Sequence, residues 1–320
     1  MATSSIHTIT VTAIKLIKGS LRAIGAIATG ETPAAQEITD AMESLNYLIK
    51  NMEGPPNFIQ PGMRMWQRES GLLTLVSTQS EYSLKPASLA FTSGGAYTVS
   101  PGDTITGATG AATAIVEKVT LSSGTWAGGD AAGTLSVYGQ SGTFEAENLN
   151  VGSNSNVATI AADASGPDLD IQIPVEIITA VLRHTTSNSD TPMRIMDLEQ
   201  YQAIGNKSSS VTPTALYYEK QLDEGKIYLD GKVSAAAAAA YKISFVYRQP
   251  LEIVDAQADE FDIEPSYYRA LKFALAKELS PEYGKPITPD VRDLAAESMA
   301  LAQTFQPEDG DYHFEPGRDE

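Results

Sequence analysis

The sequence predicts an α+β protein with a four-helix core built from both chain ends, an antiparallel β region between them and an inserted small all-β module. Three observations support this class. Apolar residues recur at helical spacing between residues 6 and 52 and again between 261 and 305, and residues 92–166 are rich in glycine and poor in charge. Neither helical segment can bury an apolar stripe alone, so we expect the two ends to pack together.

The N-terminal segment, residues 1–58, predicts a helical hairpin. Two sets of apolar residues are spaced by three and four, the spacing that places side chains on one helix face. They are Ile14, Ile17, Leu21, Ile24 and Ala28 for the first helix, and Ile38, Met42, Leu45, Ile49 and Met52 for the second. Thr32 followed by Pro33 begins the second helix and Gly54 ends it. Leu21, Ile24 and Leu45 are therefore predicted core residues.

Residues 261–305 predict a second helical hairpin. Pro265 begins its first helix and Pro281 ends it, and Thr288 begins its second helix with carboxylates in the first turn. The predicted stripes are Tyr268, Leu271, Leu275 and Leu279, then Val291, Leu294, Ser298, Leu301 and Phe305. Leu271, Leu275, Leu294 and Leu301 are therefore expected in the same core.

Residues 59–91 and 167–260 predict the antiparallel β region. Its candidate strands are 72–76, 82–84, 171–183, 215–219, 226–229 and 241–247, separated by turn residues. The six alanines from 235 to 240 favour a helix by propensity. The alternation that follows in Tyr241, Ile243 and Phe245 favours a strand, so we expect the alanines in a loop or at the start of that strand.

The inserted module is predicted over residues 92–166. Short β-prone runs at 114–119, 133–138 and 156–160 are separated by glycine turns. Loop-forming residues at both edges indicate insertion into a surface loop, so the module is expected to be dispensable for folding. A disordered low-complexity loop is the alternative that its composition leaves open.

Composition excludes several classes. The chain has 320 residues, 42% of them hydrophobic, with no cysteine and a formal charge of −18. Disulfides and thiol chemistry are excluded, and no apolar run or N-terminal signal pattern predicts a membrane span or a secretion signal. Because phosphate binding needs clustered Lys and Arg, the charge argues against ordinary nucleic-acid binding.

The acidic C-terminal tail, residues 306–320, has six acids and one arginine. Such a segment cannot form a core of its own, so we expect it to become ordered only on a partner. Tyr312 and Phe314 are its isolated apolar anchors and its candidate docking residues.

No catalytic, cofactor or metal site is predicted. His7, His184 and His313 lie in unrelated segments, and hydrolase, zinc and phosphate-loop motifs are absent from the sequence. A pair of carboxylates for glycan hydrolysis would leave no sequence pattern, so this alternative stays open.

The three aspartates Asp163, Asp168 and Asp170 suggest a calcium site at first sight. Their spacing does not match the EF-hand loop. A solvated acidic turn is the preferred interpretation.

Several segments resemble bacteriophage virion proteins. LRAIGAIATGETP (residues 21–33), followed by AMESLN (41–46), resembles the start of head-to-tail adaptors of short-tailed phages, also called packaged-DNA stabilisation or tail accessory proteins. PSYYRALKFALAKELSPEYG (265–284) is similar to the third helix of that family. GDTITGAT (102–109), SGTWAGGDAAGTL (123–135) and FEAENLNVG (144–152) resemble a β-module that occurs in phage virion proteins.

The resemblance implies a structural protein of the virion, made in the host cytoplasm and located at the head-tail junction. Adaptors of this family form a dodecameric ring below the portal protein, with helical cores around the DNA channel and C-terminal segments that dock on the portal. They present a platform for the tail nozzle or the next tail component. DNA then passes through an acidic channel without specific binding. The large central insertion departs from the family pattern.

Two other classes of function are alternatives. A virion decoration or glycan-binding tail protein would use Trp126, Tyr138 and Phe144 of the insert as a stacking platform, and a cell-wall hydrolase would use paired carboxylates. Aromatic side chains in so small a β-module more often form its core.

Overall fold

The computed structural model describes residues 10–52, 68–161, 166–261, 263 and 265–304. The chain divides into two compact units, which we describe separately. The helical unit comprises residues 1–67 and 251–320, and the β unit comprises residues 68–250. Among the described residues, none of the helices has both the length and the apolar character that a membrane crossing requires.

The predicted fold class is wrong. The described residues are mostly β, with 35% strand and 26% helix, and they form a closed six-stranded barrel, a curled sheet and six helices rather than a four-helix core. Two of these helices, α3 (Leu198–Gln202) and α4 (Ala235–Ala240), lie in the β unit. The long terminal helices give a strong periodic signal in the sequence. The short strands between them give a weak signal, although they form the larger part of the structure.

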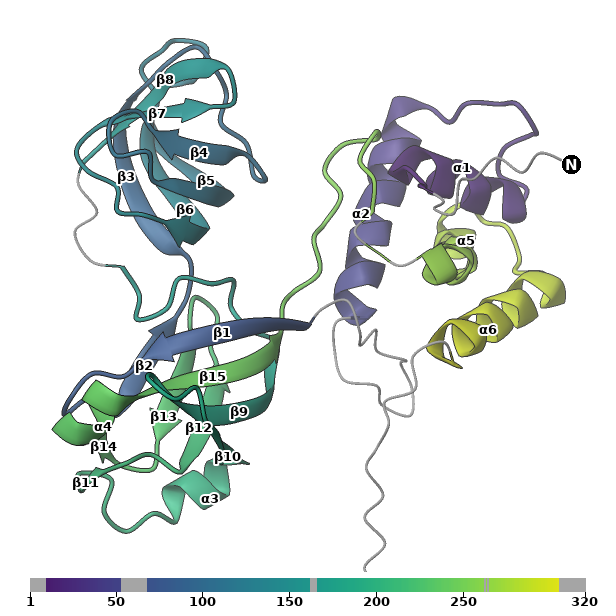
Figure 1. Cartoon of the computed structure of the whole chain (residues 1–320). Coiled ribbons are helices and arrows are strands. Elements are labelled where there is room, and N and C mark those ends of the chain that lie inside the picture. The colour runs from purple at the N-terminus through teal and green to yellow at the C-terminus, as the bar shows by residue number, and fades with distance from the viewer. Residues whose placement is uncertain (1–9, 53–67, 162–165, 262, 264, 305–320) are drawn as a thin grey trace, which may run out of the picture. The chain divides into compact units, whose positions relative to one another are not determined.

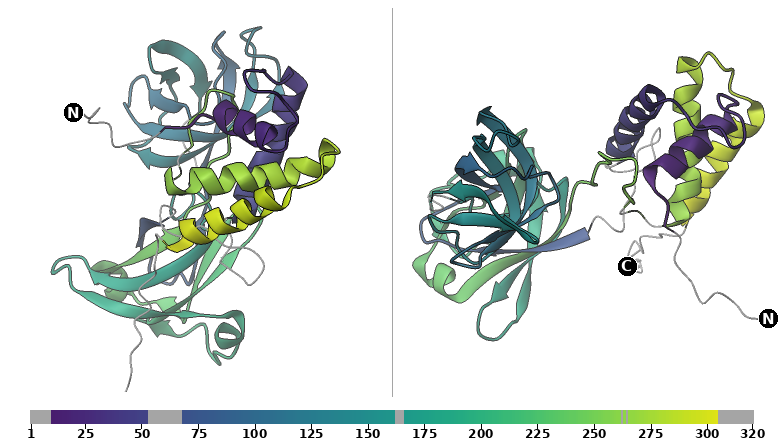
Figure 2. Two further views of the ribbon diagram at one scale, coloured as in Figure 1. Left: turned by 90° about the vertical axis from the view of Figure 1, so that its right-hand side faces the viewer. Right: turned by 90° about the horizontal axis from the view of Figure 1, so that it is seen from above.

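The helical unit contains α1 (Ala13–Ala23), α2 (Ala35–Met52), α5 (Tyr268–Glu282) and α6 (Pro289–Thr304), with a 3₁₀ turn at Pro265–Tyr267. Helix α5 packs against the other three, and Figure 2 shows it alongside α1 and α6. Residues 251–260 were expected in the β region but belong to this unit.

The curled sheet has seven strands in the order β1-β15-β9-β10-β12-β13-β2 (Figure 1). Their bounds in this order are Arg68–Thr74, Tyr241–Arg248, Glu176–His184, Asp190–Met196, Ala215–Lys220, Gly225–Leu229 and Glu81–Leu84. A separate pair, β11 (Ser210–Val211) and β14 (Lys232–Val233), is parallel, as is the pairing of β10 with β12. Every second side chain of β15, namely Ile243, Phe245 and Tyr247, is buried, so one face of the sheet contacts the core.

The alanine run forms α4 rather than a loop or a strand. Ser234 is its N-cap, with Oγ accepting a hydrogen bond of 3.2 Å from the Ala237 amide. Ala237 is buried, and Tyr241 leaves the helix in extended conformation to begin β15. A good N-cap and high helix propensity therefore outweigh the alternation of the following strand.

The barrel closes in the order β3-β6-β5-β4-β7-β8. Its strands, in chain order, are β3 (Ala87–Gly94), β4 (Thr104–Gly107), β5 (Thr113–Ser123), β6 (Ala132–Ser141), β7 (Asn148–Val151) and β8 (Asn154–Ile160). The barrel begins at Ala87, before the predicted boundary at residue 92, because the loop-like Ser93 and Gly94 form the end of β3. Inside, the Phe91 and Trp126 rings stack with centroids 5.1 Å apart.

Glu147 is a buried acid that organises one end of the barrel. Its carboxylate accepts hydrogen bonds from the amides of Thr109 (2.5 Å), Gly110 (2.9 Å) and Glu145 (3.3 Å). Gly107 makes room for it, because a Cβ there would lie 2.3 Å from Glu147 Oε1. Burial raises the pKa of Glu147, but these hydrogen bonds lower it by more, so its pKa lies below the ordinary range.

We expect Glu147→Gln to destabilise the barrel by about 2 kcal/mol at pH 7, because a charged acceptor of three amide hydrogen bonds is lost. A carboxyl whose pKa is lowered by folding contributes stability above its unfolded-state pKa and loses it as the pH falls. The difference between variant and parent should therefore shrink below about pH 4. Urea titrations across this range measure it, and a difference that grows on acidification would contradict the assignment.

The segment Asp168-Leu169-Asp170 follows the barrel and binds both the curled sheet and the barrel. Asp168 accepts hydrogen bonds from Gln79 Nε2 and the Ser83 amide, and Asp170 from the Ala87 and Gln140 amides, all between 2.7 and 3.0 Å. Leu169 forms a parallel bridge with Leu84. Both aspartates therefore bind amide groups of the protein itself. Asp163, the third member of the considered calcium set, lies outside the described residues.

This arrangement predicts that the barrel can be excised. Lys85 N donates to Leu169 O, so the chain segments that enter and leave the barrel are already neighbours. Replacing residues 87–166 with a short Gly-Ser linker should leave the curled sheet folded, since loop closure over so small a gap costs little. Soluble expression and retained amide hydrogen-exchange protection in the strands of the curled sheet check this expectation. An insoluble product would contradict it.

Candidate functional site in the helical unit

The helical unit brings together the two terminal segments that resemble phage adaptors. Leu21, Leu45, Leu271 and Leu275 are each 0% exposed and belong to one hydrophobic cluster. Ile24 is partly buried against it. These five predicted core residues are thus packed in one place.

Helices α1 and α5 approach closely at a pair of small residues. A Cβ on Gly19 would lie 3.2 Å from Lys272 Cε, so the lysine stem packs directly on the α1 backbone. Ser20 is 0% exposed, and its Oγ donates to Leu16 O (3.0 Å) and Lys272 O (2.8 Å). Small side chains and a shared hydroxyl therefore fix this crossing.

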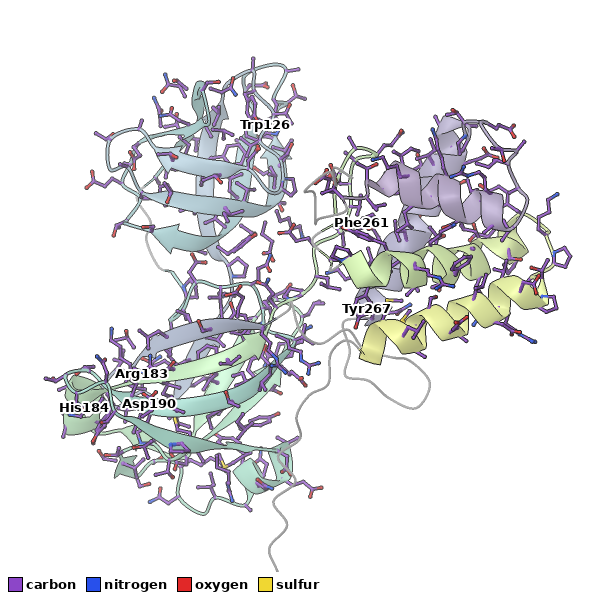
Figure 3. The ribbon with its side chains drawn as sticks, turned by 45° about the vertical axis from the view of Figure 1, so that its right-hand side comes forward. Trp126, Arg183, His184, Asp190, Phe261 and Tyr267 are labelled. Carbon is purple, nitrogen blue, oxygen red and sulfur yellow. The ribbon has the colours of Figure 1, made fainter. Side chains whose placement is uncertain are left out.

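The segment from Leu251 to Ile263 is a part of the site that the sequence patterns did not indicate. Asn46 on α2 and Val254 exchange two hydrogen bonds, of 2.8 and 2.9 Å, and Lys50 Nζ donates to Leu251 O. Phe261 and Tyr267, which are labelled in Figure 3, are both buried in the hydrophobic cluster of the helical unit. The available signal was the apolar character of Leu251, Val254 and Phe261, which is not periodic.

The same segment also accepts hydrogen bonds from backbone N–H groups in the first turn of α1. The Ala13 and Ile14 amides donate to Asp259 O and Gln257 O, so two of the unpaired N–H groups of this helix end have partners. Asp259 Oδ2 accepts from the amides of Asp255 and Ala256. The Ala256 bond lowers the pKa of Asp259, whereas the hydrogen bond to Asp259 raises the pKa of Asp255.

Helix α6 presents only part of its predicted stripe to the core, since Val291 and Ser298 are buried and Phe305 lies outside the described residues. Leu294 is half-buried and Leu301 is 45% exposed, so the core assignment of Leu301 is wrong. The buried residues of α6 are Val291, Ala295, Ser298 and Ala302. Most of these side chains are small, and the two alanines replace Leu294 and Leu301 on the buried face, which the size of the apolar residues alone did not predict.

The predicted docking residues Tyr312 and Phe314 lie outside the described residues, as do His7 and His313.

His184 stabilises a turn in the β unit. Its Nδ1 accepts hydrogen bonds from the Thr186 (3.2 Å) and Ser187 (3.3 Å) amides. Beside it, in Figure 3, both Asp190 oxygens bind Arg183 at 2.8 Å, and this guanidinium lowers the pKa of Asp190. The imidazole nitrogen that could act as a base is thus engaged by the backbone.

The candidate glycan platform of the barrel is not an exposed surface. Trp126 is 7% exposed and Phe144 1%, both in the barrel core, while Tyr138 is half-buried. Trp126 and Phe144 are therefore core residues, as their position in a small β-module favours. Within the described part of the chain, no group of three or more His, Cys, Asp or Glu side chains could hold a metal ion.

Comparison with known proteins finds no family model that matches the chain and no curated protein that matches it.

Proposed function

We propose that this chain is a structural virion protein, a head-to-tail adaptor that forms a ring below the portal, extends the DNA channel and provides a platform for tail attachment. One observation carries the proposal. The two segments that resemble the adaptor family, residues 21–33 and 265–284, come from opposite ends of the chain and contribute Leu21, Leu271 and Leu275 to one buried cluster. The two segments that resemble the adaptor family therefore also pack together in one core.

The charge of the chain suits a DNA channel. The helical unit contains 22 Asp and Glu against 11 Lys and Arg, so it carries much of the net charge of −18. Several such units around a channel would repel DNA phosphates, so the duplex could slide through without adhering. The tail nozzle or another tail component would bind the opposite face of the ring.

Portal docking is assigned to the acidic C-terminal tail, with Tyr312 and Phe314 as aromatic anchors. We expect changing both to alanine to weaken binding to the purified portal protein by more than about tenfold, since buried aromatics commonly dominate interface energies. The dissociation constant should be measured at fixed ionic strength, because the acidic residues add a salt-dependent contribution.

Leu222→Ala is a suitable control for this experiment, because Leu222 is 93% exposed in the turn between β12 and β13. It should bind the portal like the parent. An unchanged affinity of the double variant would rule out the docking assignment.

A further inference from the structure

One face of the curled sheet is partly exposed to solvent and carries cations. On neighbouring strands, Leu72 pairs with Ser244 and Ser244 with Val181, while Thr74 pairs with Lys242 and Lys242 with Arg183. These side chains point away from the core, because the residues next to them, such as Leu73 and Ile243, are buried in it.

We call this surface the open sheet face and define it by Leu72, Val181 and Val246 in its centre and Arg183, Arg194 and Lys242 at its margin. Leu72 is 46% exposed, and Arg194 is exposed. Strands β1, β15, β9 and β10 together contain five Lys and Arg against three Asp and Glu, the reverse of the chain's balance. The acid nearest the margin, Asp190, already binds Arg183 through both oxygens.

The helical unit has a surface of opposite character. Asp40, Glu43 and Tyr47 lie on one side of α2, three and four residues apart, and we call them the acidic α2 stripe. Asp40 and Glu43 are exposed, and Tyr47 is 60% exposed, with its hydroxyl bonded to Glu43. The stripe thus combines two carboxylates with an exposed aromatic ring.

We infer that the open sheet face of one copy binds the acidic α2 stripe of a second copy. The apolar centre would contact Tyr47, and the marginal cations would approach Asp40 and Glu43. Two open sheet faces would bring cations against cations, which disfavours a symmetric dimer through this surface. A contact between two different surfaces joins subunits head to tail. Such subunits form a closed ring when the rotation between neighbouring subunits brings the last one back to the first.

This inference deepens the proposed function, since it names the subunit contact of the proposed ring. It can be tested without the portal. If the contact fails, binding of the C-terminal tail to the portal is still measurable, and the reverse also holds, so failure of one proposal is distinguishable from failure of the other.

The test is a charge swap, followed by sedimentation velocity at low and high salt. One variant reverses the sheet face (Arg194→Glu with Lys242→Glu), and the other reverses the helix (Asp40→Lys with Glu43→Lys). Each variant alone would have like charges on both surfaces, so its self-association should weaken by at least roughly tenfold. An equimolar mixture should associate again, with the two variants alternating.

Lys220→Glu with Lys232→Glu is the matched control, because it makes the same change in charge at exposed positions on β12 and β14. It should associate like the parent, and thermal melts of all variants should confirm that each is folded. A monomeric parent, a sheet or helix variant that associates normally, or a mixture that stays dissociated would overturn the inference.

Discussion

Leu271→Ala is expected to destabilise the helical unit by about 2 to 5 kcal/mol, the usual cost of removing a fully buried leucine side chain. Leu271 is 0% exposed in the first turn of α5, the helix that packs against α1, α2 and α6. Leu45→Ala, at another 0% exposed site on α2, should have an effect of similar size.

Leu301→Ala is the matched control for this experiment. The same change on α6 removes a side chain that is 45% exposed, so it should cost less than about 0.5 kcal/mol. Denaturant titrations followed by the helical circular dichroism signal give all three values. Equal stability of the Leu271 and Leu301 variants would contradict the packing described here.

Phe91→Ala is expected to destabilise the barrel by about 3 to 5 kcal/mol. Phe91 is 1% exposed and stacks on Trp126 with an interplanar angle of 12°. The change removes both the packing of a large ring and the aromatic contact, which contributes about 0.5 to 1.5 kcal/mol beyond burial.

Trp126 fluorescence reports directly on this core. The chain has two tryptophans, so the measurement belongs in a Trp66→Phe background, where Trp126 is the sole tryptophan and can be excited selectively. Leu121→Ala, at a 43% exposed position on β5, is the control and should leave the unfolding transition in place. A Phe91 variant that unfolds together with this control would show that the ring stack contributes little.

The sequence predicted local structure best where a strong periodic pattern coincided with burial. The stripes containing Leu21, Leu45, Leu271 and Leu275 identified residues that are fully buried, and the glycine-rich region did form β-structure. Periodicity reports which face of a helix is apolar. It does not report how many neighbours cover that face, and for this reason Leu301 was misassigned.

The remaining differences have the same kind of cause. Val254 and Phe261 pack on the helices from an irregular segment, which has no period to detect. The fold class was misjudged because most strands are short, and their pairing depends on contacts between distant residues such as Leu84 and Leu169. Of the candidate site, Tyr312 and Phe314 stay predictions, because they lie outside the described residues.

Electron microscopy of the purified protein mixed with its portal protein tests the proposed adaptor function most directly. We expect negatively stained images to show a ring of this chain, coaxial with the portal and attached to its tail-facing end. Portal particles without added density, at protein concentrations well above those needed for assembly, would contradict it.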